Sequence, residues 1–141
     1  MTVTALFSPK QPRKKTMVSL MLSGARAGFP SPADDHIEKR LDLNDLLITD
    51  KASTFLVRAK GDSMINAGIH DGDLLVVDRS LNATDGRVII AVVEGNFTVK
   101  RLRRKGARVW LEAANEKFAP IEITDEESAV WGVVTNAIHH L

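Results

Sequence analysis

The sequence predicts a mainly β domain, built as a compact and strongly bent antiparallel sheet, with a flexible arm at its N-terminus. From Thr54 onward, short β-favouring runs alternate with turn residues such as Asp85-Gly86. Charge is divided unevenly along the chain. Residues 1–27 hold five basic residues and no acidic residue, whereas the remaining residues carry four more acidic than basic residues, and the whole chain has a net charge of +1. A length of 141 residues suits one core. We therefore divide the chain into an arm, residues 1–27, and a domain, residues 28–141.

The arm begins with a segment that disfavours helix. Pro9 and Pro12 flank basic residues, and Lys10 to Lys15 is typical of a flexible basic segment. Such a segment is able to contact nucleic acid or an acidic protein surface, but we favour a solvated arm as the simpler interpretation. The apolar run Met17 to Leu22 follows, and we expect it to pack on the domain or on a partner subunit.

The segment from Ser23 to Pro32 is rich in small residues and proline. Because a residue before proline is biased towards extended geometry, Pro30 and Pro32 predict an extended, sterically open segment. Beyond it, Asp34 or Asp35 is able to cap a short helical turn. Residues 43–48 form a second candidate turn.

Short strands account for most of the remaining chain. We expect them at residues 54–60, 73–78, 87–93, 96–103, 107–112, 120–123 and 129–138. The hairpin at 101–108 carries five basic residues but no aromatic residue to stack on bases, so we favour a solvated hairpin tip over contact with nucleic acid. Trp110, Phe118 and Trp131 are assigned to the core or a dimer face.

Ser63 stands out between an apolar strand and an abrupt turn, in the run Lys60-Gly61-Asp62-Ser63-Met64-Ile65. A serine hydroxyl at such a turn is a candidate nucleophile, but it requires a base to take its proton. No histidine is a convincing base, because they lie in polar turn segments or at the C-terminal end. They are His36, His70, His139 and His140.

Lys100 is the better candidate base, since serine with lysine is a recognised hydrolytic pair. A lysine acts as a base only when neutral, which requires burial, at a cost of about 1.4 kcal/mol per unit of pKa lowering. Strand alternation places Lys100 on one face with Thr98 and Leu102. From this run alone, a lysine that reaches solvent from a strand edge is the simpler interpretation.

Three motifs together favour the catalytic interpretation. In order and spacing, Gly61-Asp62-Ser63-Met64, Asp71-Gly72-Asp73 and Phe97-Thr98-Val99-Lys100-Arg101 resemble the LexA/UmuD family of self-cleaving serine peptidases. The likeness extends over about residues 27 to 138. It implies a LexA-like catalytic and dimerisation domain in residues 28–141, with Ser63 as nucleophile and Lys100 as base.

The same resemblance implies a substrate within the chain itself. The scissile bond is expected between Ala27 and Gly28, in the extended segment described above. The backbone N–H groups of Ser63 and Met64 are the natural donors to the oxyanion. Cleavage within one subunit and cleavage by a dimer partner are both within reach of the arm.

The resemblance also implies a role in the SOS response to DNA damage. Self-cleavage is expected to be stimulated by RecA filaments on single-stranded DNA. The processed homodimer is then expected to act with a UmuC-type polymerase, as the accessory subunit of an error-prone translesion DNA polymerase. Whether the basic arm or the 101–108 hairpin contacts DNA directly is left open by the sequence.

Composition narrows the alternatives. The chain has no cysteine, no glycine-rich phosphate loop and no evident metal cluster, so we expect no cofactor. No apolar run approaches about 18 residues, which predicts a cytoplasmic protein without a membrane anchor and disfavours a signal-peptidase-like enzyme. An arm of 27 residues is too short for a helix-turn-helix domain. A dimeric binding module that does not cleave, and a LexA-like regulator without a DNA-binding domain, remain as alternatives.

Overall fold

The chain forms two units, one of residues 1–9 and 50–141 and one of residues 10–49. The computed structural model describes residues 1–7, 15, 17–21, 37–49 and 52–141. Within these ranges, every helix falls short of the length and apolar character needed to cross a membrane.

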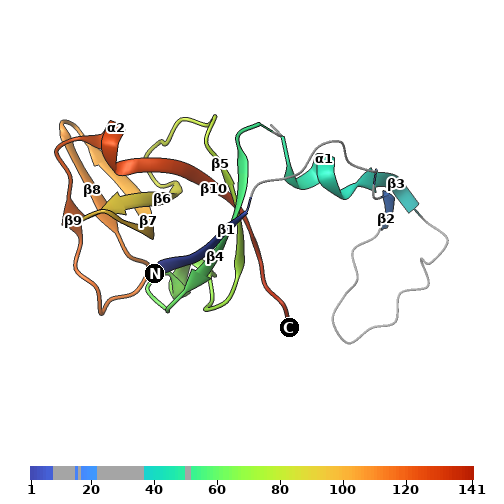
Figure 1. Ribbon diagram of the computed structural model, residues 1–141, viewed down its shortest axis with the longest axis horizontal. Coiled ribbons are helices and arrows are strands. Elements are labelled where there is room, and N and C mark those ends of the chain that lie inside the picture. The colour runs from blue at the N-terminus through green and yellow to red at the C-terminus, as the bar shows by residue number, and fades with distance from the viewer. Residues whose placement is uncertain (8–14, 16, 22–36, 50–51) are drawn as a thin grey trace. The chain divides into compact units, whose positions relative to one another are not determined.

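The larger unit is an antiparallel β structure. Its described strands are β1 (Thr2–Phe7), β4 (Thr54–Lys60), β5 (Leu74–Asp78), β6 (Val88–Val93), β7 (Asn96–Lys105), β8 (Arg108–Glu112), β9 (Ile121–Glu122) and β10 (Val130–Ile138). A 3-10 helix, η1 (Ile65–Ala67), follows β4, and a short helix, α2 (Glu126–Ala129), precedes β10. The mainly β fold predicted from the sequence is confirmed (Figure 1).

The strands close on themselves. Their spatial order is β1-β4-β5-β10-β6-β7-β8-β9, and β1 also pairs with β7 through a bridge between Thr2 and Thr98. A closed ring is therefore formed by six strands, in the order β1, β4, β5, β10, β6 and β7. Strands β8 and β9 extend the sheet outward from β7. Pairing on both sides of β1 makes the N-terminal strand the element that closes the ring.

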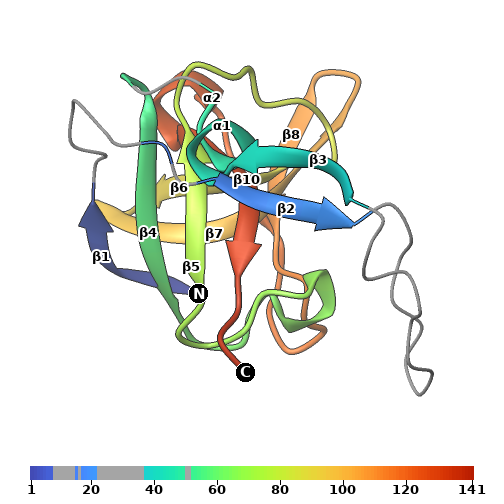
Figure 2. The same ribbon diagram turned by 90° about the vertical axis from the view of Figure 1, so that its right-hand side faces the viewer.

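The sheet bends where β10 changes its register. Register shifts occur between Val130 and Gly132 and between Val134 and Asn136, and such irregularities increase local twist. In Figure 2, β4, β5 and β10 run alongside one another while β6 and β7 cross behind them. This arrangement accounts for the strong bend that the short strands predict.

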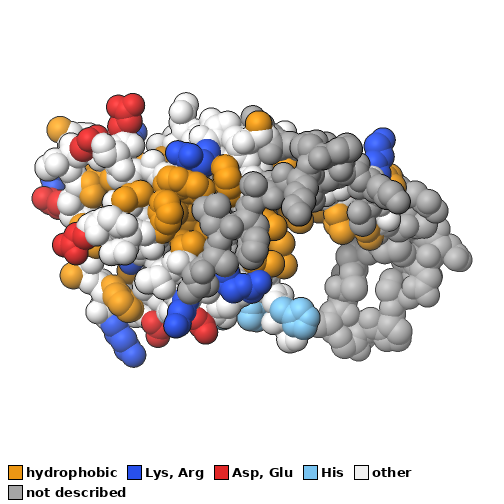
Figure 3. Space-filling view, viewed as in Figure 1, with side chains coloured by type: hydrophobic (Ala, Val, Ile, Leu, Met, Phe, Trp, Pro, Cys, Tyr) orange, Lys and Arg blue, Asp and Glu red, His pale blue; other side chains and the backbone are white. Residues whose placement is uncertain are grey.

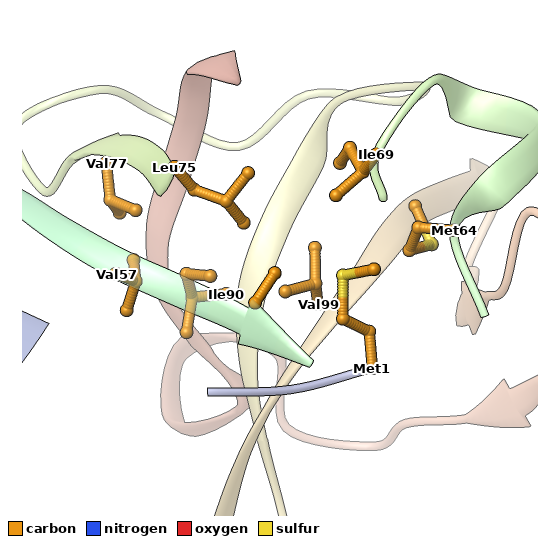
Figure 4. Close-up of a cluster of buried hydrophobic side chains, with 9 residues drawn as sticks. Met1, Val57, Met64, Ile69, Leu75, Val77, Ile90 and Val99 are labelled. Atoms are coloured by element: carbon orange, nitrogen blue, oxygen red, sulfur yellow. The ribbon is translucent and has the colours of Figure 1, made fainter. Parts of the chain in front are cut away.

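Strand alternation divides the buried side chains into two clusters. On β6, Ile90 contributes to one cluster, whereas Ile89 and Ala91 contribute to the other. The first cluster, shown in Figure 4, consists of Met1, Val57, Ala59, Met64, Ile69, Leu75, Val77, Ile90 and Val99. The second consists of Ile89, Ala91, Leu102, Leu111 and Val133. The first cluster reaches the N-terminal residue, so β1 is part of the core as well as of the sheet.

The smaller unit is a two-stranded hairpin followed by a helical turn. The apolar run from Met17 forms β2 (Met17–Met21), which pairs with β3 (Ile37–Asp42). The predicted turn at 43–48 is confirmed as α1 (Leu43–Leu47), with the Asp42 carboxylate accepting a hydrogen bond from the Asn44 N–H at 3.0 Å. Asp34 and Asp35 lie outside the described residues, and the chain after them is a strand rather than a helical turn.

The seven strands expected between residues 54 and 138 are all present, with ends that differ from the expected ones by at most two residues. Three strands were not anticipated, namely β1, β2 and β3. The pairing partners of β1 lie 49 or more residues away along the chain, a separation that local sequence patterns do not register.

Candidate active site

Ser63 lies in a tight turn directly after β4. Gly61 has φ +101°, a left-handed conformation that side chains rarely adopt, and its N–H donates to the Asp71 carboxylate at 2.8 Å. The chain then turns into η1, which ends at Gly68 with φ +80°. Ser63 is buried, with 1% of its surface exposed. The sequence Gly-Asp-Ser-Met therefore folds into a turn that fixes the serine at the end of a strand.

Met64 anchors this turn in the core. Its side chain is fully buried in the first cluster (Figure 4), and its backbone carbonyl accepts hydrogen bonds from the N–H groups of Ala67 at 3.0 Å and Ile69 at 3.3 Å. The Ala114 N–H donates to the Met64 sulfur at 3.3 Å, and the Ala114 carbonyl accepts from the Asn66 N–H at 2.9 Å. Packing and hydrogen bonds thus hold the residue after Ser63 from both sides.

Lys100 occupies the middle of β7, opposite Ile89. Only 7% of its surface is exposed, so it is not a lysine that reaches solvent from a strand edge. Its Nζ lies 5.8 Å from the centre of the Phe118 ring. Burial lowers the pKa of Lys100 from its ordinary value of 10.5, although a hydrogen bond to the N-terminal amino group opposes the shift. The structure therefore supplies the burial that a lysine base requires.

Ser63 and Lys100 meet at the α-amino group of Met1. This amino group donates a hydrogen bond to Ser63 Oγ, and the Lys100 side chain is near enough to lower the pKa of the same amino group. The serine and lysine side chains therefore both lie beside the first residue. The two residues predicted from separate parts of the sequence are thus brought to one place.

The Met1 amino group is itself perturbed by this position. Burial, together with the charge and hydrogen bond of Lys100, lowers its pKa from 8.0 to about 6, although the Asp62 carboxylate opposes the shift. The Met1 carbonyl accepts hydrogen bonds from the Thr98 hydroxyl at 2.6 Å and from the Val99 N–H at 2.9 Å. The first residue is therefore held in β-sheet geometry across the serine hydroxyl.

A pocket of about 350 Å³ opens beside these groups. It is lined by Met1, Thr2, Lys60, Gly61, Asp62, Ser63 and Phe118. Phe118 is 44% exposed, so it is not part of the core, the first of its two expected places, and its ring lies at the pocket near Lys100; the dimer face stays a prediction. The sequence carried no signal for this placement, because Phe118 belongs to an irregular loop between β8 and β9.

The predicted oxyanion donors are the backbone N–H groups of Ser63 and Met64. Within the described part of the chain, no acceptor is found for the backbone N–H of Ser63 or of Met64. Ala27 and Gly28, the expected cleavage site, lie outside the described residues.

Two of the four histidines lie together elsewhere, around the buried Asp73. The Asp73 carboxylate accepts a hydrogen bond from the backbone N–H of His70 at 2.8 Å, and its other oxygen lies 2.7 Å from Nδ1 of the His139 ring. Burial by itself raises the pKa of Asp73, but these hydrogen bonds and the neighbouring histidine charges hold it below its ordinary value. These two histidines lie 69 positions apart in the sequence, and neither was predicted to have a partner.

Three of the five basic side chains of the 101–108 hairpin pair with acidic neighbours. Arg103 lies 3.6 Å from carboxylate oxygens of both Asp85 and Glu112, and Arg108 pairs with Glu122. Arg104 pairs with Glu126. Ion pairing leaves less positive charge for phosphate groups, which agrees with the preference for a solvated hairpin tip.

Comparison with known proteins agrees with these features. The family described as Peptidase S24-like matches residues 19–135. The protein SamA of Salmonella typhimurium is 43% identical over 134 residues, which cover 95% of this chain and 94% of SamA. The protein ImpA of Escherichia coli is 44% identical over 120 residues, covering 85% of this chain and 82% of ImpA. The LexA repressor of Aliivibrio salmonicida is 39% identical over 120 residues, covering 84% of this chain but 58% of that repressor.

Proposed function

The chain belongs to the peptidase S24-like family, and we propose that it is a self-cleaving serine peptidase in which Ser63 is the nucleophile and Lys100 the general base. One observation carries the proposal. Ser63 Oγ accepts a hydrogen bond from the Met1 amino group, the buried side chain of Lys100 lowers the pKa of that same amino group, and burial lowers the pKa of the lysine itself. A serine and a lysine that are close together and shielded from solvent form the pair that this chemistry requires.

The proposed reaction proceeds in two steps. Neutral Lys100 takes the hydroxyl proton of Ser63, and Oγ attacks the carbonyl carbon of Ala27. The N–H groups of Ser63 and Met64 stabilise the oxyanion that forms. Lys100, now an ammonium group, protonates the leaving amine of Gly28, and water then hydrolyses the acyl-enzyme. Each chain is cut once, because its own arm is the substrate.

The position of Met1 supports this assignment of roles. Its α-amino group stands where the leaving amine of the substrate would stand, in contact with both the serine oxygen and the lysine. Its carbonyl is held by main-chain and side-chain donors of β7. A peptide that continues in this direction along β4 and β7 is therefore bound in the extended geometry that we expect for the residues after Ala27.

We further propose a role in the SOS response. In this proposal, RecA filaments on single-stranded DNA stimulate the cleavage, and the processed homodimer serves a UmuC-type polymerase as accessory subunit in error-prone translesion synthesis. Relatives of similar length, 43% to 44% identical over most of the chain, support the assignment. The chain is also similar to the LexA repressor of Aliivibrio salmonicida, and the alignment covers 58% of the length of that repressor.

A dimeric binding module that does not cleave is the second candidate. It is favoured by the hydrogen bond between the Met1 amino group and Ser63, which covers the hydroxyl group. A displaced N-terminal strand would be required before any substrate reaches the serine.

The test is the intact mass of the purified protein over time between pH 7 and pH 10. We expect a fragment beginning at Gly28 that forms faster as the pH rises, because the neutral fraction of Lys100 increases. Ser63→Ala and Lys100→Ala should abolish the fragment. Lys105→Ala, which alters an exposed lysine on the same strand, should leave the rate unchanged.

A second arm of the experiment adds RecA, single-stranded DNA and a non-hydrolysed ATP analogue. Faster cleavage of the native chain would support the SOS assignment. A native chain that stays intact at every pH and with this addition would rule out self-cleavage and leave the binding module.

A further inference from the structure

Three side chains from distant parts of the chain converge near the C-terminal end of β10. His70 and Asp73 belong to the turn between β4 and β5, and His139 follows β10. One nitrogen or oxygen atom from each lies within 4.8 Å of the others, and the two imidazole rings are 4.4 Å apart between centroids. Figure 3 shows pale-blue histidine side chains next to one another on the surface of the molecule.

The carboxylate at the centre of this cluster is buried. The Asp73 side chain is 1% exposed, whereas the side chains of His70 and His139 are 45% and 44% exposed. One carboxylate oxygen lies 2.7 Å from Nδ1 of His139, and the other lies 3.7 Å from Nδ1 of His70. Each imidazole thus lies next to a different oxygen of the same carboxylate, and both rings are partly exposed to solvent.

One atom of the cluster lacks a partner. Nδ1 of His70 is buried, yet it has no hydrogen-bond partner within the described residues. A buried nitrogen without a partner costs free energy, and such atoms in folded proteins usually have an identifiable reason. A metal ion coordinated by this nitrogen would remove the cost.

We propose that His70, Asp73 and His139 form a binding site for a divalent transition metal ion, with Zn²⁺ as the best match. Two imidazole nitrogens and one carboxylate oxygen are a donor set that suits zinc, with water at the remaining position. Ligand atoms around tetrahedral zinc lie about 3.3 Å apart, since each is about 2.0 Å from the metal. The separations of 2.7 and 3.7 Å at Asp73 bracket this value, and the three ligand atoms lie within 4.8 Å of one another, so the side chains must rotate to close around one ion. The site is independent of the function proposed above.

Metal binding at this place would connect His139, after β10, to the turn at residues 70–73, which is hydrogen-bonded to the segment around Ser63. The Gly72 N–H donates to the Ala59 carbonyl at 2.9 Å, and the Ile69 N–H donates to the Met64 carbonyl at 3.3 Å. Binding to the native state alone stabilises it by mass action. Zinc should therefore raise the unfolding temperature and tighten the turn that carries the nucleophile.

Titration of the full chain with Zn²⁺ and with Co²⁺ tests the site, in protein free of any histidine tag. We expect one equivalent to bind, with the visible absorption typical of tetrahedral Co²⁺ and a zinc-dependent rise in Tm. His139→Gln and His70→Gln should each weaken binding by more than about tenfold and remove the Tm rise. The matched control is His140→Gln, which alters the adjacent exposed histidine.

Metal-free unfolding of each variant establishes that the substitutions leave the fold intact. If His139→Gln does not fold, His70→Gln decides the question alone. The proposal is overturned if the native chain binds neither metal ion, or if His140→Gln loses as much affinity as His139→Gln. It is also overturned if both ligand variants retain the affinity of the native chain.

Discussion

Replacement of Met64 by alanine tests how strongly the core positions the nucleophile. The Met64 side chain is fully buried among Val99, Ile69 and the other members of the first cluster. Alanine removes three heavy atoms from this place and leaves a cavity, which for methionine in a core costs about 2–5 kcal/mol. Because the turn is hydrogen-bonded to the 113–120 loop and cannot collapse freely, we expect about 3–4 kcal/mol.

Urea unfolding measures this cost directly. With a slope of about 2 kcal/mol per molar urea, the midpoint should fall by about 1.5–2 M without a change in slope. Met64→Leu nearly conserves volume and should cost less than about 1.5 kcal/mol. Self-cleavage should slow in the alanine variant, since Ser63 loses its fixed neighbour, and persist in the leucine variant. A loss below about 1 kcal/mol for Met64→Ala, or equal losses for both variants, would refute the reasoning.

Three further predictions concern single residues of the larger unit. Gly132→Ala should destabilise the fold by about 1–3 kcal/mol, because a Cβ there would stand 2.7 Å from a Val77 methyl group; an unchanged Tm would contradict this. Lys100→Met should stabilise the protein at pH 7. Because the pKa of Lys100 is lowered in the folded state, the unfolded chain binds more protons than the folded chain up to about pH 10.4, and methionine removes this cost. Urea unfolding at a series of pH values should show the gain in stability shrinking as the pH approaches about 10.4. Asp78→Ala should cost about 2–3 kcal/mol by the same measurement, because the buried carboxylate accepts hydrogen bonds from the Ser80 N–H at 2.8 Å and hydroxyl at 2.6 Å; a loss below about 0.5 kcal/mol would contradict it.

Strands from Thr54 onward could be predicted because their signals are local. Runs of β-favouring apolar residues and turn glycines mark each strand within its own residues, as the run Val88–Val93 and the glycine at position 95 illustrate. The strand Ile37–Asp42 was missed because its Glu, Lys, Arg and Leu residues favour helix. Pairing with β2 decides its conformation, and this pairing is not visible in the residues themselves.

The candidate site shows the same division. Ser63 and Lys100 were predicted from motif spacing, and the burial that their chemistry requires is present in the structure. Two parts of the site could not be predicted, namely the Met1 amino group at the serine and Phe118 beside the lysine, and neither could the separate histidine cluster at Asp73. Each depends on contacts between residues far apart in the chain, which only the closed sheet creates.

Closure of the ring by β1 has a consequence for any chain that lacks residues 1–7. Without β1, five of the seven residues of β4 lose their partner along one side, and the ring opens between β4 and β7. Unpaired N–H and C=O groups along a sheet edge form a template for an extended segment of another chain. Removal of the arm would therefore create a new docking edge beside Ser63, where a strand from a partner protein adds to the sheet by main-chain hydrogen bonds.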